Sequence, residues 1–131
     1  MRERIRVLVA EDNVDLAMAV RELLHGEEDL EVVGVIDDAS TLAQAVRDCD
    51  ARVVVLDLNL AGGSSVPAMQ LVCRERPTTG VVIYSGYDRD DVAAALPALG
   101  AVEYVSKSGD VAELIDAVRR SARKTAAGAD R

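Results

Sequence analysis

The chain has 131 residues, a composition that is 50% hydrophobic and 29% charged, and a formal net charge of −8. This length fits one compact domain, and the composition is that of a globular protein rather than a disordered one. The acidic balance argues against nucleic-acid binding by the domain as a whole, and the scarcity of aromatic residues argues against base stacking.

No apolar run reaches the length of a membrane span, and the charged start MRERIR is not that of a signal peptide. We therefore expect a cytoplasmic protein without membrane contact. The two cysteines, Cys49 and Cys73, show no metal-ligand spacing and are predicted to be reduced thiols.

Five short runs rich in β-branched residues predict β-strands that alternate with stretches of helical period. The runs at Val53–Leu56 and Val81–Ile83 do not alternate between apolar and polar residues, which predicts strands buried on both faces. In chain order, the predicted strands are Ile5–Ala10, Leu30–Ile36, Arg52–Leu56, Val81–Ser85 and Val102–Ser106.

The predicted helices begin at residue types that favour a helix N-terminus. Ser65 is a predicted N-cap, and Pro67 follows in the first turn, where proline is tolerated. The last helical stretch carries a basic cluster from Arg119 to Lys124, which we expect to be a solvated face rather than an interface with an acidic partner or a second protomer. The five helices are predicted to begin at or near Asn13, Asp38, Ser65, Asp88 and Asp110.

This alternation predicts an α/β fold in which helices cover both faces of a parallel sheet. Right-handed crossovers favour a flavodoxin-like, doubly wound (βα)5 arrangement with five parallel strands in the order 2-1-3-4-5. We expect residues 1–124 to form this domain. The helical period is lost in the tail RKTAAGADR, so residues 125–131 are predicted to be a disordered tail or the start of a linker.

Three carboxylates are predicted to meet at one edge of the sheet. In such folds, ligands bind beyond the carboxyl ends of the strands, where the strand order reverses. Glu11 and Asp12 follow the first strand, and Asp57 follows the third. At about 5 Å and an effective dielectric of ~20, each pair would repel by roughly 3 kcal/mol, so the cluster needs raised pKa values, a cation or both. Mg²⁺ prefers oxygen ligands of this kind.

The other two strand ends carry groups that suit a phosphoryl group. The fourth run ends in Ser85, which Gly86 follows, and Lys107 follows the fifth run. A lysine, a hydroxyl, backbone amides and a metal are the usual supports of a transferring phosphoryl group. Asp57 could be the nucleophile, because carboxylates form aspartyl phosphates. Each feature alone is weak, and the prediction depends on the coincidence of four strand ends.

These strand ends resemble those of response-regulator receiver domains of two-component signalling, in particular receivers that precede helix-turn-helix output domains. The resemblance covers nearly the whole chain and rests on RVLVAEDN, VVVLDLNLAGG, VVIYSGYD and GAVEYVSKSG. It implies a signalling module that is not an enzyme beyond its own phosphoryl transfer and dephosphorylation. It also implies a sensor histidine kinase or phosphotransfer protein as donor, and an output domain or a homodimer, with transcription regulation as one output.

The resemblance also implies a role for each acidic residue. Asp57 would accept a phosphoryl group from a phosphohistidine. Glu11, Asp12 and Asp57 would bind Mg²⁺ or Mn²⁺, and the backbone carbonyl of Asn59 would be a further ligand.

The resemblance further implies phosphate-binding and switch residues. Lys107, Ser85 and Gly86 would contact the phosphoryl group. Ser85 would then move toward the phosphate, and Tyr104 would swing inward to fill the vacated space. The surface that changes would be formed by the fourth helix, the fifth strand and the fifth helix.

Four departures from the usual receiver pattern are visible. The loop at 60–63 reads Leu-Ala-Gly-Gly without a proline, which predicts a looser loop. Ser108 follows the lysine in place of a proline, which predicts a trans peptide. Pro97 lies inside the fourth helical stretch and predicts a short helix that closes by Gly100. The acidic pair is Glu-Asp, which changes reach but not ligand type.

The main alternative is a phosphorylation-independent pseudo-receiver that acts only as an interaction module. Asp57, Ser85 and Lys107 argue against it because the chain retains the groups needed for phosphorylation. A different protein on the same fold is a further alternative. The chain lacks the Gly-x-Gly-x-x-Gly of dinucleotide-binding proteins, and Asn59 stands where phosphatases with an Asp nucleophile usually carry a second Asp.

Overall fold

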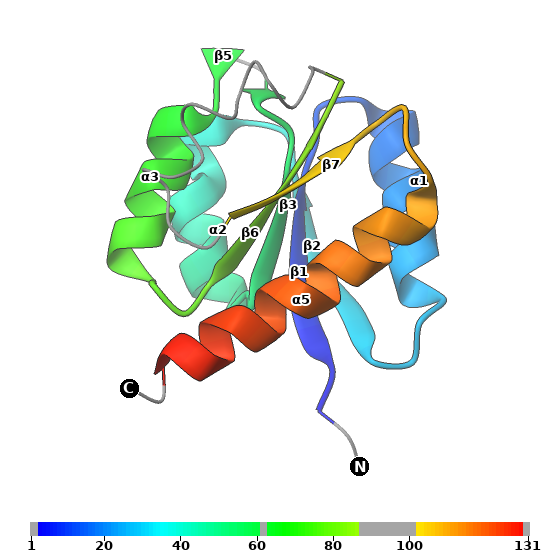
Figure 1. Ribbon diagram of the computed structural model, residues 1–131. Helices are drawn as coiled ribbons and strands as arrows, with labels where there is room; N and C mark the ends of the chain where they lie inside the picture. The colour runs from blue at the N-terminus through cyan, green and yellow to red at the C-terminus, as the bar shows by residue number, and fades with distance from the viewer. Residues whose placement is uncertain (1–2, 61–62, 87–101, 130–131) are drawn as a thin grey trace.

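The β-branched runs form the strands that the sequence pattern predicts. The computed structural model describes residues 3–60, 63–86 and 102–129, and its central sheet is parallel, in the order β2-β1-β3-β6-β7 (Figure 1). In chain order this is 2-1-3-4-5, so the predicted doubly wound fold is confirmed. The sheet strands are β1 (Ile5–Ala10), β2 (Leu30–Ile36), β3 (Val53–Leu56), β6 (Gly80–Ser85) and β7 (Val102–Ser106).

Helices lie on both faces of this sheet, and the core is therefore divided into two layers (Figure 1). On one face, Leu24 and Leu114 are fully buried. On the other, Met69 and Leu42 are fully buried against β1 and β3. Burying one such side chain contributes roughly 1.5–3 kcal/mol. The helices are α1 (Val14–His25) and α5 (Val111–Ala129) on the first face, and α2 (Leu42–Cys49) and α3 (Val66–Glu75) on the second.

Three of the predicted N-terminal residues accept hydrogen bonds at the start of their helices. The side chain of Asn13 accepts from the Leu16 amide at 3.1 Å. Asp38 begins a short 3₁₀ turn (Ala39–Thr41) ahead of α2, so the second helix starts later than predicted. The carboxylate of Asp110 accepts from the Ala112 amide at 3.0 Å. These bonds satisfy amides that have no partner within the helix.

Two further predictions concern the helix expected from Asp88 and the C-terminal tail. The predicted helix from Asp88, with Pro97 and Gly100, lies outside the described residues. α5 continues to Ala129, so residues 125–129 have a helical backbone, which does not test whether they belong to a tail or to the start of a linker. The boundary between the domain and a linker stays a prediction. No helix among residues 3–60, 63–86 and 102–129 is long and apolar enough to cross a bilayer.

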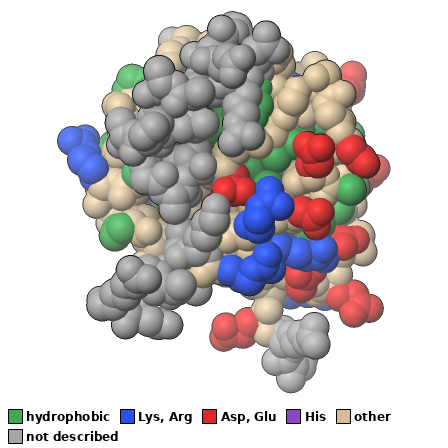
Figure 2. Space-filling view, viewed as in Figure 1, with side chains coloured by type: hydrophobic (Ala, Val, Ile, Leu, Met, Phe, Trp, Pro, Cys, Tyr) green, Lys and Arg blue, Asp and Glu red, His purple; other side chains and the backbone are tan. Residues whose placement is uncertain are grey.

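The basic cluster on α5 is engaged with acidic side chains of the same chain. Figure 2 shows Lys and Arg side chains lying among Asp and Glu side chains on the face that α5 covers. Arg119 donates to both carboxylate oxygens of Asp29 and to Glu27, at 2.8–2.9 Å, and these partners raise its pKa. Arg120 donates to Glu103 at 2.8 Å. These pairs support the expected solvated face rather than a free basic surface.

The C-terminal half of α5 is joined to the beginning of two strands. The guanidinium of Arg52, next to β3, donates to the Ala122 carbonyl at 2.9 Å. At the start of β6, Gly80 lies so close to α5 that an added Cβ would overlap Ser121 Oγ and lie 3.0 Å from the Ser121 carbonyl oxygen. Because that oxygen belongs to the helix backbone, the contact can be relieved only by moving α5 away from the sheet.

We expect Gly80→Ala to lower the free energy of unfolding by about 2 kcal/mol, because overpacking a close contact typically costs 1–3 kcal/mol. Chemical denaturation followed by circular dichroism measures this. Gly86→Ala is the matched control, because no atom of the residues that the structure describes lies within 4 Å of its added Cβ. Equal stability of the two variants would contradict the close approach of α5 to β6.

Candidate functional site

The sheet places Glu11 and Asp57 side by side. Ala10 and Leu56, the last residues of β1 and β3, are register partners, and each is followed directly by an acidic residue. The Asp57 amide donates to the Ala10 carbonyl at 3.0 Å. On the other side, the Glu11 amide donates to the Ile36 carbonyl at 2.9 Å. Both acidic residues are therefore held to the sheet by their own backbone.

The predicted convergence of three carboxylates is confirmed. Glu11, Asp12 and Asp57 each place one carboxylate oxygen within 4.8 Å of the others. Glu11 and Asp57 are only 5% and 8% exposed, whereas Asp12 is exposed. Carboxylates buried this closely are costly unless a cation or a hydrogen-bond donor offsets their repulsion.

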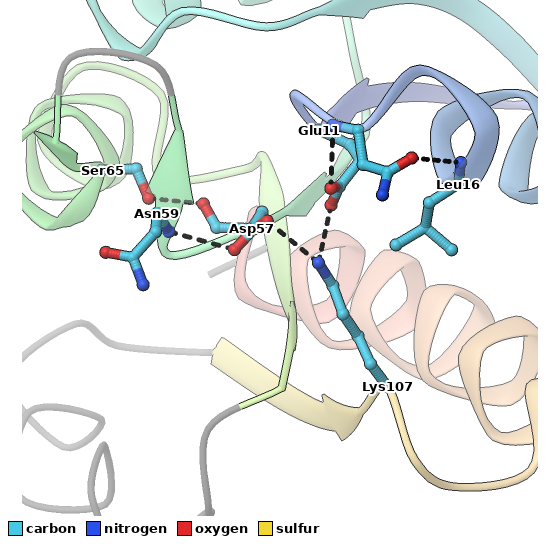
Figure 3. Close-up of polar contacts among 7 residues, drawn as sticks. Glu11, Leu16, Asp57, Asn59, Ser65 and Lys107 are labelled. Atoms are coloured by element: carbon cyan, nitrogen blue, oxygen red, sulfur yellow. Dashed lines mark hydrogen bonds and ion pairs between the residues drawn. The ribbon is translucent and has the colours of Figure 1, made fainter.

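Lys107 supplies the cation in this structure. Its Nζ donates to Glu11 Oε2 at 3.0 Å and to Asp57 Oδ2 at 2.9 Å (Figure 3). The Lys107 amide also donates to the Ser85 carbonyl at 2.9 Å, which fixes the backbone from which the side chain extends. Lys107, which the sequence predicts to contact a phosphoryl group, thus bridges the two buried carboxylates.

The pKa values of the bridged groups are shifted by their surroundings. Burial, assisted by the charge of Asp57, raises the pKa of Glu11, and the hydrogen bond from Lys107 only partly opposes this. Burial alone would lower the pKa of Lys107, but its hydrogen bonds to Asp57 and Glu11, with their charges, outweigh burial and raise it. The ammonium group therefore stays charged between the carboxylates at neutral pH.

Backbone amides bind the remaining oxygens of the buried carboxylates. The Asn13 amide donates to Glu11 Oε1 at 3.2 Å, and the Asn59 amide donates to Asp57 Oδ1 at 3.0 Å. Each carboxylate thus accepts from a backbone amide on one oxygen and from Lys107 on the other. The orientation of the Asp57 side chain is fixed from both sides, as a reacting group requires.

The other predicted site residues lie at the same end of the sheet or point toward its core. Ser85 is fully buried at the end of β6, and its register partner Ser106 ends β7 directly before the lysine. Gly86 follows and is exposed. Tyr104 is partly buried against the core on the α2 and α3 side. Movements of Ser85 and Tyr104 stay predictions.

The loop after Asp57 is closed by its own backbone. Two short strands, β4 (Asn59–Leu60) and β5 (Gly63–Ser64), pair antiparallel, and the Ser65 amide donates to the Leu58 carbonyl at 2.8 Å. Whether the loop is loose, as its sequence predicts, stays a prediction; residues 61–62, which carry the first of the two glycines, lie outside the described residues.

The backbone around the lysine is held by two serines. As expected from the serine that follows the lysine, the Lys107–Ser108 peptide is trans. Ser106 and Ser108 share a hydroxyl–hydroxyl hydrogen bond of 2.7 Å, and the Ser108 amide donates to Ser106 Oγ at 3.2 Å.

Two residues of the site were not anticipated. The Lys107 ammonium lies 5.9 Å from the centroid of the buried Tyr84 ring, within the range of a cation–π contact. The hydroxyl of Ser65 donates to the backbone carbonyl of Asp57 at 2.7 Å, and its oxygen accepts no hydrogen bond from an amide of α3. The strand register could have indicated Tyr84, which pairs with Val105, two residues before the lysine. The sequence carries no comparable signal for Ser65.

The donor set fits a hard divalent cation. Mg²⁺ prefers carboxylate and carbonyl oxygens, and oxygen atoms bound to one such ion at 2.0–2.1 Å lie about 3–4 Å apart. The three carboxylate oxygens, which lie within 4.8 Å of one another, approach that spacing. Asp12 is the exposed member, so the site opens to solvent on its side.

In doubly wound α/β domains, ligands bind beyond the carboxyl ends of the strands at the topological switch point, which is where the carboxylates and the lysine of this chain are gathered. Residues 7–119 match the family described as response regulator receiver domain, and the chain belongs to that family.

Known proteins of similar sequence or fold include regulators and an enzyme. The chain is 27% identical to the transcriptional regulatory protein LiaR of Bacillus subtilis (strain 168) over 119 residues, 91% of this chain and 56% of LiaR. It is 37% identical to protein-glutamate methylesterase/protein-glutamine glutaminase 6 of Anaeromyxobacter dehalogenans (strain 2CP-C) over 107 residues, 81% of this chain and 30% of that protein. The chain thus spans about half or less of the length of these relatives.

Solved structures share the fold. A two-component response regulator of the LuxR family from Aurantimonas sp. SI85-9A1 superposes with a TM-score of 0.83 at 24% identity, over 90% of this chain and 84% of that one. At this identity the likeness concerns the fold alone.

Proposed function

We propose that the domain is a phosphorylatable switch in which Asp57 accepts a phosphoryl group from a phosphohistidine on a sensor histidine kinase or a phosphotransfer protein. One carboxylate oxygen attacks phosphorus, a P–O bond forms, the P–N bond breaks, and the histidine leaves with its electron pair. The observation that carries this proposal is the position of Asp57, which is buried, anchored to the sheet and gathered with Glu11, Asp12 and Lys107.

Different residues of the chain would bind the metal and the phosphoryl group during this transfer. Glu11, Asp12 and Asp57, with the backbone carbonyl of Asn59, would hold Mg²⁺, which when bound supplies positive charge against the phosphoryl oxygens. Lys107 would exchange its bond to Asp57 Oδ2 for a phosphoryl oxygen. Charge stabilisation of this kind is the main contribution that a protein makes to phosphoryl transfer.

Two further groups would respond to the new charge. The Ser85 hydroxyl and the Gly86 backbone would contact the phosphoryl group from the end of β6. Tyr104 would move into the space that Ser85 leaves, and the changed surface of β7 and α5 would control an output. Such a change biases a two-state element by local electrostatics and packing.

An exposed apolar patch beside the acidic site supports a protein as donor. Val14 and Met18 on α1 are 70% and 57% exposed, and Val35 on β2 is 43% exposed. Together with Glu11 and Asp12 they line a cavity of about 290 Å³. A donor protein that covers this patch would bring its phosphohistidine to the edge of the carboxylate site.

The wider role follows from the family and its relatives. We propose a cytoplasmic signalling module that catalyses only its own phosphorylation and dephosphorylation. The transcriptional regulator among its relatives favours control of transcription through an output domain or a homodimer. In that scheme, DNA contact belongs to the output and not to this domain.

We expect the purified chain to gain the mass of one phosphoryl group when it is incubated with acetyl phosphate and Mg²⁺, as measured by intact mass spectrometry. Chelating the metal with EDTA should abolish the gain, because the three carboxylates would then repel the incoming phosphoryl group. The absence of any gain with Mg²⁺ or Mn²⁺ would contradict the proposed function.

A phosphorylation-independent interaction module is the second candidate. One observation favours it: Lys107 already pairs with both Glu11 and Asp57, so the buried carboxylates have a cationic partner without a phosphoryl group. In that case, an Asp57→Asn variant would retain full output activity in a reporter assay. Loss of output in that variant would instead support the phosphorylatable switch.

A further inference from the structure

Ser65 occupies the position of a helix cap but does not cap its helix. It directly precedes α3 and is fully buried. A serine in this position ordinarily accepts a hydrogen bond from an amide of the first helical turn. Here the Ser65 side chain makes no such bond, and the exposed Ser64 hydroxyl accepts from the Val66 amide at 3.2 Å. The Ser65 hydroxyl can therefore form a hydrogen bond with a group outside its own helix.

That group is the backbone carbonyl of Asp57, the proposed phosphoryl acceptor. Ser65 Oγ donates to the Asp57 carbonyl oxygen at 2.7 Å, and both atoms lie in the buried interior of the loop (Figure 3). The Ser65 amide donates to the next carbonyl, that of Leu58, at 2.8 Å. Two successive carbonyls of the acceptor segment are therefore held by one residue, which is eight positions further along the chain.

These bonds fix the peptide that connects Asp57 to Leu58. The Asp57 amide is already bonded to Ala10, and Asp57 Oδ1 accepts from the Asn59 amide. Because Ser65 donates to the Asp57 carbonyl, every polar group of Asp57 has a hydrogen-bond partner. These bonds fix the turn that orients the Asp57 carboxylate. A shift of this peptide would move both the nucleophile and Asn59.

We propose that Ser65 is a positioning residue for phosphoryl transfer: its hydroxyl holds the Asp57–Leu58 peptide and, through it, the Asp57 carboxylate and the Asn59 carbonyl. This inference rests on the proposed function. It predicts that the Ser65 hydroxyl acts on the rate of transfer and on metal binding and not only on stability, because misplacing a reacting group by about 1 Å can cost up to 10²-fold in rate.

The test compares Ser65→Ala and Ser65→Cys with the wild type in the full chain. Ser65→Ala removes the donor, and Ser65→Cys keeps a weak donor of similar size. The control is Ser64→Ala, which removes the neighbouring hydroxyl that serves the Val66 amide. Phosphorylation by acetyl phosphate is followed by mass spectrometry over a range of donor and Mg²⁺ concentrations, and thermal unfolding is recorded by circular dichroism.

We expect Ser65→Ala to lower the limiting rate about tenfold and to raise the Mg²⁺ concentration needed for half the maximal rate about threefold. Ser65→Cys should lie between Ser65→Ala and the wild type, and Ser64→Ala should change neither quantity by more than about twofold. If Ser65→Ala does not fold, Ser65→Cys decides by the same criteria.

Limiting rates and Mg²⁺ requirements within about twofold of the wild type in the Ser65 variants, even with a lowered melting temperature, would overturn the inference and show a merely structural hydroxyl. In that case the wild type is still phosphorylated, and the proposed function stands. A wild type that gains no phosphoryl group would overturn both.

Discussion

Asp57→Asn is expected to abolish the gain of a phosphoryl group with acetyl phosphate and Mg²⁺. The substitution keeps the size of the side chain and an oxygen that can accept from the Asn59 amide, but an amide cannot form the acyl phosphate. Intact mass spectrometry should show the unmodified mass after an incubation that converts the wild type.

The control is Asp48→Asn, which alters an exposed carboxylate on α2 that accepts a hydrogen bond from Gln44. Asp48 lies in the last turn of α2, which leads into the start of β3, whereas Asp57 follows the opposite end of that strand. It should be phosphorylated at the wild-type rate. Equal labelling of Asp57→Asn and the wild type would show that the phosphoryl group is attached elsewhere, and the assignment of Asp57 would fail.

Lys107→Ala is expected to have the second largest effect, and this effect depends on the metal. Without Mg²⁺, Glu11 and Asp57 would remain buried side by side without their cation. Removing one partner of a buried ion pair costs about 3–5 kcal/mol, and since the Lys107 side chain is 23% exposed, we expect the free energy of unfolding to fall by about 2 kcal/mol. Millimolar Mg²⁺ should restore most of this loss, because the metal replaces the ammonium charge.

Urea denaturation with and without Mg²⁺ measures this exchange. Arg120→Ala is the control, because it removes a half-exposed cation that pairs with Glu103 at the surface, a contact worth at most about 1 kcal/mol. A Lys107→Ala variant as stable as the wild type without metal would contradict the bridging role of the lysine. A loss of stability in this variant that Mg²⁺ does not restore would also contradict that role.

The fold could be predicted from sequence because its strands are defined by local composition. The run at Val102–Ser106 was predicted with the bounds that the structure shows, and the other strands differ by at most one residue. The third strand starts at Val53 rather than at Arg52, whose side chain instead reaches α5. The two-residue strands β4 and β5 have no such signal, because they are too short to show a period.

The site could be predicted in part. The ends of neighbouring parallel strands bring Glu11, Asp12 and Asp57 together independently of side-chain packing. The strand order was therefore sufficient to predict this cluster. The partners of individual side chains could not be predicted in this way. Ser65 obeys the sequence rule for a helix cap, yet a tertiary contact with Asp57 takes its hydroxyl. The sequence predicts Lys107 as a contact of a phosphoryl group, and in the structure the carboxylates of Glu11 and Asp57 accept its hydrogen bonds.

The bond from Arg52 to the Ala122 carbonyl and the close approach of Gly80 to Ser121 have a consequence for hydrogen exchange. Because β3 has only four residues, Arg52, which ties the start of the strand to α5, lies only about 17 Å along the chain from Asp57, which follows the end of the strand. The C-terminal half of α5 cannot open without breaking contacts to β3 and β6, so these elements should exchange their amide protons as one cooperative unit. We therefore expect the amide of Asp57 to exchange together with those of β3, β6 and the C-terminal half of α5.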